Sequence, residues 1–342
     1  MPTPVTGRSR WPPDPVTAAP HPLAATPPPA RTSSRYAPTT ASRADTPSRI
    51  AQAALATLYE NTVAAQLVHR DYSSEFVGAV GDTVTIREPA VFEAEEFDPV
   101  TGINIQDATE NGIPVVLNHH ADVSFAITSK QRTLELADFR EQLLNPALEA
   151  ISQKIDRDTL GFRNDITAEV GTVAGSLWDQ PEALIQAGVE LDVHNVPQVD
   201  RRVIVGPRTR GKWLANDLLK RADRSGSTAG LRQGSIGADV FGFDAYMSQN
   251  IGQPPSPGVA GDPTTEVSVA FHRTAVALVT RQLELPYGAQ DAAIEGYKGF
   301  GIRVVFDYDI NKKKDIVSLD ILYGVKTLDK NRAVLIKGAD KA

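Results

Sequence analysis

The sequence contains no cysteine, only two methionines and few aromatic residues, which make up 6% of the chain. Without cysteine it can form no disulfide bond, thiolate metal site or thiol nucleophile. It also lacks any apolar run near the roughly 18 residues of a transmembrane helix. The sequence therefore predicts a soluble, intracellular protein with no membrane contact, stabilised by packing and polar contacts alone.

Basic residues are too few to offset the acidic ones. The 35 Lys and Arg against 42 Asp and Glu give a formal net charge of −7. A protein that grips nucleic acid through its phosphates needs a basic surface, so we expect any contact with DNA to be weak and non-specific. The length of 342 residues allows two domains, or one core with excursions.

Residues 1–47 lack both lysine and glutamate, yet they hold 12 of the 24 prolines. Such proline density can neither sustain a helix nor bury a core, so we expect a disordered extension. It also forbids the amphipathic helix of a transit peptide, and the apolar core of a secretory signal is missing. The alternative interpretation is a start site assigned too far upstream.

A long hairpin is expected after a first helix. That helix has its apolar residues on one face: Ala51, Leu55, Leu58, Tyr59, Val63 and Leu67. In the hairpin, residues 82–88 form one strand, 89–113 an acidic tip, and 114–128 the return strand, in which odd-numbered positions face one side. The thirteen residues from Val115 to Ile127 would span about 43 Å as a strand. A compact domain of about 300 residues has a radius of gyration near 19 Å. A two-stranded arm that leaves its domain is marginal in water, so the pattern predicts completion by a neighbouring molecule.

The remainder predicts an α+β fold with a helical spine. Asn145 is expected to cap a long helix that begins at Pro146. Its predicted apolar stripe comprises Leu148, Ile151, Ile155 and Phe162. A shorter helix that carries Leu184, Ala187 and Leu191 is expected to open at Pro181. Strands are expected after it at 203–205, 267–281, 300–310, 315–325 and 332–337.

Residues 206–212 imitate a phosphate-binding loop. Gly206, Gly211 and Lys212 have the spacing of a P-loop between a strand and a helix. Trp213, however, stands where a Ser or Thr hydroxyl should ligate magnesium, and Pro207 removes a backbone donor. We interpret the match as a strand–helix turn and keep an NTPase as a remote alternative.

Two further motifs carry little chemistry. The HRD sequence at 69–71 imitates a kinase catalytic loop, but Phe76 stands where such a loop needs Asn. His119 and His120 are neighbours on the return strand, so they point to opposite faces and cannot share one metal ion. His120 and Asp122 share a face, but two potential ligands without a third are weak evidence for a metal site. The sequence predicts no metal, no cofactor and no catalytic residue.

Six stretches in order carry a family resemblance. They are LYENTVAAQLVHRDYSSEF with GDTVTIREPAVFEAEEF, QDATENGIPVVLNHHADVSFAITSKQ, LLNPALEAISQKIDRDTL, GFDAYMSQNI, AFHRTAVALVTRQLE and GFGIRVVFDYDINKKKDIVSLDILYGVKTL. Together, from about residue 48 to 338, they resemble the major capsid proteins of tailed bacteriophages, in the form found in phages and prophages of actinobacteria. Residues 1–47 lie outside the resemblance.

The resemblance implies the Hong Kong 97-type capsid fold, an α+β structure. It implies an N-terminal arm at 48–77 and an extended-loop hairpin at 78–130. A peripheral domain with the spine helix would comprise 131–175 and 263–320, and an axial domain 176–262 and 321–342. Copies of the chain would assemble as pentamers and hexamers of an icosahedral head in the bacterial cytoplasm, with scaffolding and portal proteins as partners and packaged DNA in non-specific contact.

The resemblance also sets expectations for the contacts between subunits. The first lysine of the chain is Lys130, at the base of the hairpin, so a lysine crosslink from the extended loop is not expected. We expect the acidic tip to meet a basic patch of a neighbour, either Lys312–Lys314 or Arg201–Arg202. The candidate contact residues are Arg87, Glu93, Glu95, Glu96, Asp98, His120 and Asp122.

Two alternatives to a phage head stay open beside the NTPase. An encapsulin-like nanocompartment shares the fold and would enclose cargo enzymes instead of DNA. A nucleic-acid module built on the HRD helix or the basic arm would show salt-sensitive DNA binding.

Overall fold

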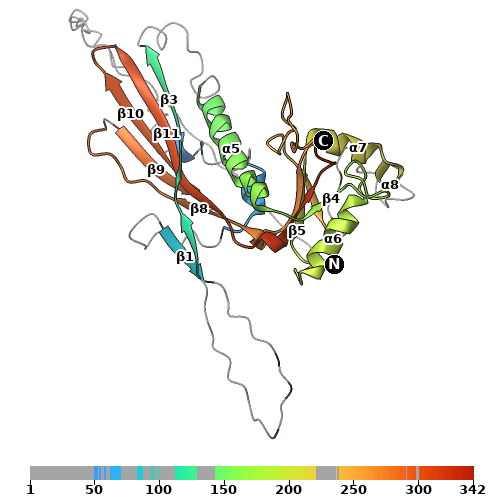
Figure 1. Cartoon of the computed structure of the whole chain (residues 1–342). Coiled ribbons are helices and arrows are strands. Elements are labelled where there is room, and N and C mark those ends of the chain that lie inside the picture. Colours follow the sequence, from blue (N-terminus) through green and yellow to red (C-terminus); the bar gives the residue numbers. More distant parts are fainter. Residues whose placement is uncertain are drawn as a thin grey trace, which may run out of the picture. The chain divides into compact units, whose positions relative to one another are not determined.

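The computed structural model describes residues 50–52, 54, 58, 62–70, 83–87, 94, 96, 99, 112–128, 143–220, 236, 239–289, 291–297 and 300–342. The N-terminal extension at 1–47 lies outside these residues. The described part is built on two five-stranded sheets, a two-stranded ribbon and a small set of helices (Figure 1).

The first sheet has the strand order β3-β11-β10-β9, and its strands are antiparallel. Its longest strand, β11, pairs with β3 along one edge; along the other it pairs first with β10 and then with β8. The strands are β3 (His119–Thr128), β8 (Val276–Arg281), β9 (Asp291–Tyr297), β10 (Phe300–Asp309) and β11 (Lys314–Thr327). Residues with alternating polarity in β11 therefore divide between two faces of this sheet.

The second sheet has the order β4-β12-β7-β5-β6 and mixes parallel and antiparallel pairs. β12 runs parallel to β4, and β5 runs parallel to β6, whereas β7 is antiparallel to both of its neighbours. The strands are β4 (Glu169–Val170), β5 (Arg201–Val205), β6 (Asp244–Met247), β7 (Ser268–His272) and β12 (Ala333–Ile336).

The ribbon consists of β1 (Thr83–Arg87) and β2 (Gly112–Val116), which pair antiparallel. Thr83 lies opposite Val116 and Arg87 opposite Gly112, so the acidic loop joins the two strands at the Arg87 end. The expected hairpin is present, but its return strand is interrupted at Leu117 and Asn118, where β2 ends and β3 begins.

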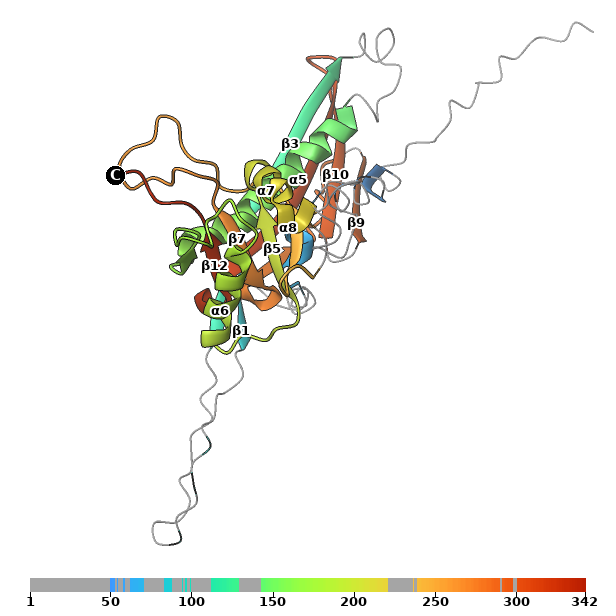
Figure 2. The same ribbon diagram turned by 90° about the vertical axis from the view of Figure 1, so that its right-hand side faces the viewer.

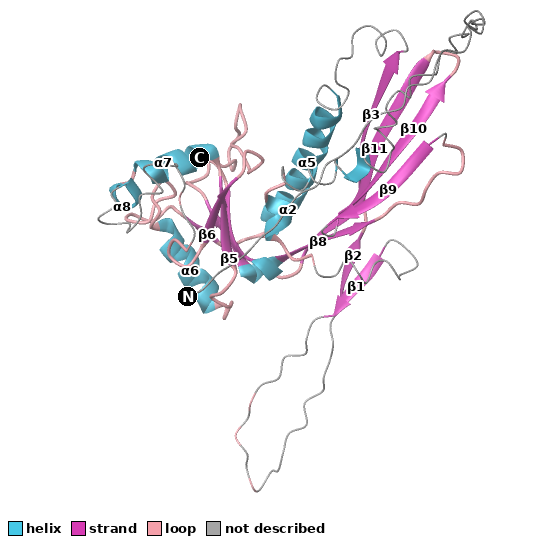
Figure 3. Cartoon of the chain, turned by 180° about the vertical axis from the view of Figure 1, so that it is seen from behind, coloured by secondary structure: helices cyan, strands magenta, loops and turns pink. Residues whose placement is uncertain are grey.

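Helix α5 (Asn145–Leu160) runs along the first sheet and continues into the 3₁₀ turn η2 (Gly161–Asp165) (Figure 3). The predicted stripe is confirmed, because Leu148, Ile151, Ile155 and Phe162 are all buried. The predicted cap is wrong: Leu144 is the N-cap residue and Asn145 already belongs to the helix. Short helical segments are α2 (Ala64–Leu67), η3 (Arg273–Ala275) and η4 (Lys330–Arg332).

Helices α6 (Ala183–Val193), α7 (Pro207–Ala215) and α8 (Asp217–Lys220) accompany the second sheet (Figure 2). The predicted apolar side of α6 is confirmed, since Leu184, Ala187 and Leu191 are fully buried. These helices share one apolar core with one face of the second sheet. Residues on its other face, such as Val269 of β7 and Leu335 of β12, join α2, α5 and the first sheet in another core. None of the helices in the described ranges is long and apolar enough to span a membrane.

The stretch 267–281, expected as one strand, is two strands in different sheets. β7 pairs with β5 and β12 in the second sheet, and β8 pairs with β11 in the first. The turn η3 separates them, and the His272 imidazole accepts a hydrogen bond from the backbone N–H of Thr274 to start it. Both halves are almost entirely buried, so their apolar pattern carried no sign of the break. Strand β9 was not predicted. The boundary expected between residues 320 and 321 lies inside β11.

Candidate assembly surface

The ribbon is anchored to the first sheet by a small apolar cluster. Ile86 of β1 and Val115 of β2 are buried, and so are Ala277 and Val279 of β8. Leu117 at the interruption completes the cluster. Ile86 lies next to the Arg87 end of the ribbon and Val115 next to the Thr83 end, so the cluster holds the ribbon along its length, and residues 88–111 join its strands beyond Arg87.

A glycine of β11 permits the close approach of the ribbon. A Cβ atom on Gly324 would lie 2.3 Å from the carbonyl oxygen of Val116. Any side chain at this position would push the end of β2 away from β11. Gly324 thus determines where the ribbon leaves the sheet.

The predicted contact residues of the loop can be placed only in part. Arg87 is the last residue of β1 and pairs with Gly112. Glu96 is exposed. Glu93, Glu95 and Asp98 lie outside the described residues.

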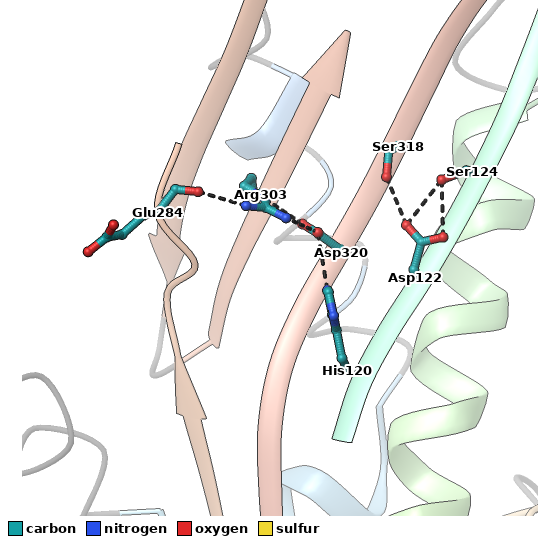
Figure 4. A network of polar contacts seen from close by, with 7 residues as sticks. All are labelled: His120, Asp122, Ser124, Glu284, Arg303, Ser318 and Asp320. Carbon is teal, nitrogen blue, oxygen red and sulfur yellow. Dashed lines mark hydrogen bonds and ion pairs between the residues drawn. The ribbon is translucent and has the colours of Figure 1, made fainter. Parts of the chain in front are cut away.

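His120 and Asp122 lie in a polar network on one face of the first sheet (Figure 4). His120 Nε2 lies 3.2 Å from a carboxylate oxygen of Asp320 on β11. Arg303 of β10 also binds Asp320, with an Nε–Oδ1 distance of 3.0 Å. This hydrogen bond raises the pKa of the Arg303 guanidinium. Asp320 is therefore shared by two strands that flank β11.

Asp122 is the second centre of the network. Its carboxylate accepts a hydrogen bond of 2.8 Å from Ser318 and one of 3.1 Å from Ser124, and it remains exposed (Figure 4). The two predicted residues thus have partners within the chain. Arg303 and Asp320 were missed, because strand alternation gives the face of a residue and not the strand beside it.

His119 points to the opposite face of the sheet. Its ring stacks on Tyr323 with 5.3 Å between centroids, and its Nδ1 lies 3.6 Å from Asp158 of α5. Burial alone would raise the pKa of Asp158, but hydrogen bonds from the Tyr323 hydroxyl and from Lys154 hold it below its ordinary value. The adjacent histidines therefore serve different networks, and no group of three or more potential metal ligands occurs within the described ranges.

The P-loop-like turn holds a carboxylate of the chain itself where a nucleotide phosphate would lie. Glu266, which is 1% exposed, accepts backbone hydrogen bonds from Arg208 at 3.2 Å and Thr209 at 2.9 Å, at the N-terminus of α7. A carboxylate oxygen of Glu266 would lie 2.3 Å from a Cβ atom placed on Gly206, so a side chain at this position would collide with it and glycine is required. Helix N-termini attract anions, and here the anion is a buried side chain. The geometry thus favours the interpretation of residues 206–212 as a strand–helix turn over their interpretation as a nucleotide-binding loop.

The last residue of that motif, Lys212, and the adjacent Trp213 make contacts within the chain. Trp213 is fully buried and donates a hydrogen bond from Nε1 to the carbonyl oxygen of Trp178 at 2.9 Å. Lys212 lies over the Trp178 ring, with its Nζ 3.4 Å from Asp179.

Arg201–Arg202 is not a free basic patch, and this expectation is wrong. Arg201 is buried and donates hydrogen bonds of 2.6 Å to Asp192 and to the carbonyl oxygen of Val196. Arg202 donates a hydrogen bond of 2.5 Å to the carbonyl oxygen of Leu67. Lys312, in contrast, is 73% exposed on the turn between β10 and β11.

A second buried carboxylate holds the N-terminal segment. Asp156 of α5 accepts hydrogen bonds from the backbone N–H groups of Val63 at 3.0 Å and Ala64 at 3.1 Å, at the start of α2. Burial raises the pKa of Asp156 to about 6, and the backbone donors offset only part of this effect. His69 of the HRD motif follows, and its backbone bonds to Val276 and Leu278 of β8. His69 thus lies in a segment that joins α5 to the first sheet, whereas Asp71 of the motif is outside the described residues.

No protein-family model matches the sequence, and no curated protein matches it either. Solved structures do match. A structure from Mycobacterium phage Che8 is 23% identical, with a TM-score of 0.60 over 80% of this chain and 90% of that chain. The capsid of Cyanophage P-SCSP1u is 14% identical, with a TM-score of 0.54 over 77% of this chain and 85% of that chain.

A shell from outside the phages is also similar. The holo-SrpI encapsulin complex from Synechococcus elongatus PCC 7942 is 13% identical, with a TM-score of 0.50 over 80% of this chain and 86% of that chain. These likenesses define a fold of shell proteins. The chain has the Hong Kong 97-type fold, as the resemblance implied.

Proposed function

We propose that this chain is the major capsid subunit of an actinobacterial tailed phage or prophage. The observation that carries the proposal is the fold, which extends over 80% of the chain and 90% of the structure from Mycobacterium phage Che8. Sequence resemblance along residues 48–338 supports the same family independently. In this proposal the chain forms pentamers and hexamers of an icosahedral head in the host cytoplasm and ends in the virion.

The ribbon supports self-assembly on physical grounds. It is held by a five-residue pairing of β1 with β2 and by one small apolar cluster, and isolated two-stranded ribbons are marginal in water. A neighbouring copy that covers the acidic loop would add contact area and opposite charge. The exposed Lys312, with Lys313 and Lys314, is the basic patch that we propose for this contact, and Glu93, Glu95, Glu96 and Asp98 are its proposed partners. Arg87 is a further proposed contact residue, outside this pairing of opposite charges.

The separate strand pairing of the two five-stranded sheets supports a division into peripheral and axial domains, although the second sheet contributes to both apolar cores. We assign the first sheet with α5 to the peripheral domain and the second sheet with α6 and α7 to the axial domain. β7 and β12 then belong to the axial part. Scaffolding and portal proteins are the further partners that we propose, together with non-specific contact to packaged DNA.

An encapsulin-like shell is the second candidate, because the encapsulin complex from Synechococcus elongatus has a similar fold. A catalytic role has no comparable support: the phosphate position of the P-loop-like turn holds Glu266.

Electron microscopy and sedimentation of the purified protein, with and without residues 1–47, test the proposal. Closed shells, or rings of five and six subunits, are the expected result, and nuclease-protected double-stranded DNA in particles from phage-producing cells separates a head from an encapsulin. Monomers from both proteins at every concentration, also after co-expression with the neighbouring reading frames, would contradict the proposal.

A further inference from the structure

Helix α6 presents an apolar stripe on its outer side. Ile185, Val189 and Val193 follow each other at four-residue spacing and are 48%, 54% and 69% exposed. Residues at this spacing lie above one another on a helix, so the stripe is about 12 Å long. The inner side of the helix already packs on the second sheet, and the stripe is therefore a separate surface.

Acidic groups flank this stripe. Helix α6 contains Glu190 and Asp192 and no basic residue. Glu190 is exposed and has no partner among the described residues. Asp192 is half exposed, although one of its oxygens binds Arg201. We call the surface of Ile185, Val189, Glu190, Asp192 and Val193 the acidic face of α6.

Helix α7 carries the opposite charge. It contains Arg208, Arg210 and Lys212 and no acidic residue. Arg208 and Lys212 lie one turn apart, and the Arg208 side chain is exposed without a partner among the residues that the structure describes. Two helices that both accompany the second sheet therefore present side chains of opposite charge without a partner in the described part of the chain, Glu190 on α6 and Arg208 on α7 (Figure 2).

Exposed apolar side chains adjoin the α7 charges. Lys212 lies over the ring of Trp178, next to Leu177, which is 36% exposed. Val173 in the same loop is 55% exposed, and the hydrogen bond from Ser176 N–H to its carbonyl oxygen makes this loop a tight turn. We call the surface of Val173, Leu177, Arg208 and Lys212 the basic face of α7.

We propose that the acidic face of α6 in one copy packs against the basic face of α7 in the next copy. Each face combines an apolar centre with one charged side chain left without a partner, Glu190 or Arg208, as interfaces with an apolar core and a charged rim do. Because the two faces differ, the contact is head-to-tail, and repetition of a head-to-tail contact closes into a ring when the rotation allows it. The inference rests on the proposed function and assigns residues to a ring contact.

A contact of α6 with α6 is the competing arrangement. It would bring the acidic groups of two copies together without a cation, which like-charge repulsion disfavours. The head-to-tail contact gives Glu190 a cationic partner instead.

The absence of cysteine makes a direct test possible. The variants Val189→Cys and Leu177→Cys are prepared separately, mixed, assembled and treated with a short bismaleimide crosslinker. The mixture should give crosslinked dimers at least tenfold above either variant alone. A matched control replaces Leu177→Cys with Val259→Cys, since Val259 is 66% exposed and belongs to neither face.

The outcomes separate this inference from the proposed function. Particles that form without the Val189–Leu177 crosslink would overturn the inference and leave the capsid proposal standing. Dimers from Val189→Cys alone would establish the α6–α6 contact and overturn the inference as well. If neither particles nor crosslinks form at high concentration, this result counts against both the inference and the capsid proposal.

Charge reversal gives a second readout. Glu190→Arg and Arg208→Glu should each raise the critical concentration for ring formation about tenfold, and the double variant should restore it. Equal assembly of all four proteins would overturn the inference. Circular dichroism spectra that match the wild type show that the exposed substitutions leave the fold intact.

Discussion

The stretch from Gly112 to Thr128 forms two strands, β2 and β3, whose surroundings differ. All ten residues of β3 pair with β11, and α5 covers the strand from one side. β2 pairs with β1, and the two strands contact the sheet through one small apolar cluster. The same alternation of apolar and polar residues thus serves a strand that is complete within one chain and a ribbon that is not. Alternation specifies the faces of a strand, but it does not specify whether the partner belongs to the same chain.

The packing around α5 is complete within one chain, so substitutions there should change the stability of the unassembled subunit. Ile155 is fully buried, so Ile155→Ala should lower the free energy of unfolding by about 2–5 kcal/mol. Urea denaturation of unassembled subunits measures this. The matched control is Ile185→Ala, at 48% exposure, which should change stability by no more than about 0.5 kcal/mol. Equal losses would refute the comparison.

Asp156 tests the same region through pH. Its folded pKa of about 6 exceeds the ordinary 3.8, so its contribution to stability is fully present below pH 3.8 and is lost as pH rises through about 6. The difference corresponds to about 3 kcal/mol at 1.36 kcal/mol per pKa unit. In urea denaturation between about pH 4 and 7, the wild type should lose that much relative to Asp156→Asn, which cannot titrate.

Asp158→Asn provides the control for this pH series. The pKa of Asp158 is lowered, so its contribution has the opposite sign and is lost as pH falls. A difference between wild type and Asp156→Asn that does not vary with pH would show that Asp156 titrates normally.

Gly324 tests the anchor of the ribbon. A Cβ atom there would meet the Val116 carbonyl at 2.3 Å, so Gly324→Ala should cost about 1–3 kcal/mol. Hydrogen exchange should show faster exchange in β1 and β2 and unchanged protection in β10. Gly288→Ala is the control, since nothing lies within 4 Å of its Cβ position. Uniform loss of protection over the first sheet would contradict a separate ribbon.

The smallest effect on the subunit, and one confined to assembly, is expected at Lys312. Lys312→Glu should change the free energy of unfolding by no more than about 0.5 kcal/mol, because the side chain is 73% exposed. Light scattering should nevertheless show weaker assembly, with recovery in the double variant Lys312→Glu with Glu96→Lys. Lys330→Glu, also at an exposed position, is the matched control. Normal assembly of Lys312→Glu would remove this residue from the proposed contact.

Several elements could be predicted from local pattern alone. The stripe of α5, the buried side of α6 and the alternation from Val115 to Ile127 follow from residue spacing, because a helix or strand that packs on one side repeats with a fixed period. The same reasoning placed His120 and Asp122 on one face and His119 on the other. The acidic loop could be identified by composition, although most of its predicted contact residues lie outside the described part of the chain.

Other features depended on contacts between residues far apart in the sequence. The division of 267–281 between two sheets, the pairing of Arg303 with Asp320 and the burial of Arg201 leave no periodic trace. Buried carboxylates give the sharpest case. In the sequence Asp156 and Glu266 resemble ordinary surface charges. In the structure Asp156 accepts a backbone hydrogen bond at the start of α2, and Glu266 accepts one at the start of α7.

The sequence by itself determined the long helices and most of the long strands, their apolar faces and the absence of thiol chemistry, because these depend on residue type and local spacing. Only the tertiary structure decided which strands are neighbours, which charges are buried and which apolar stripe remains exposed. The reason is physical: local sequence sets what a segment can bury, whereas pairing and burial depend on what another segment of the chain, or of a second copy, brings to it.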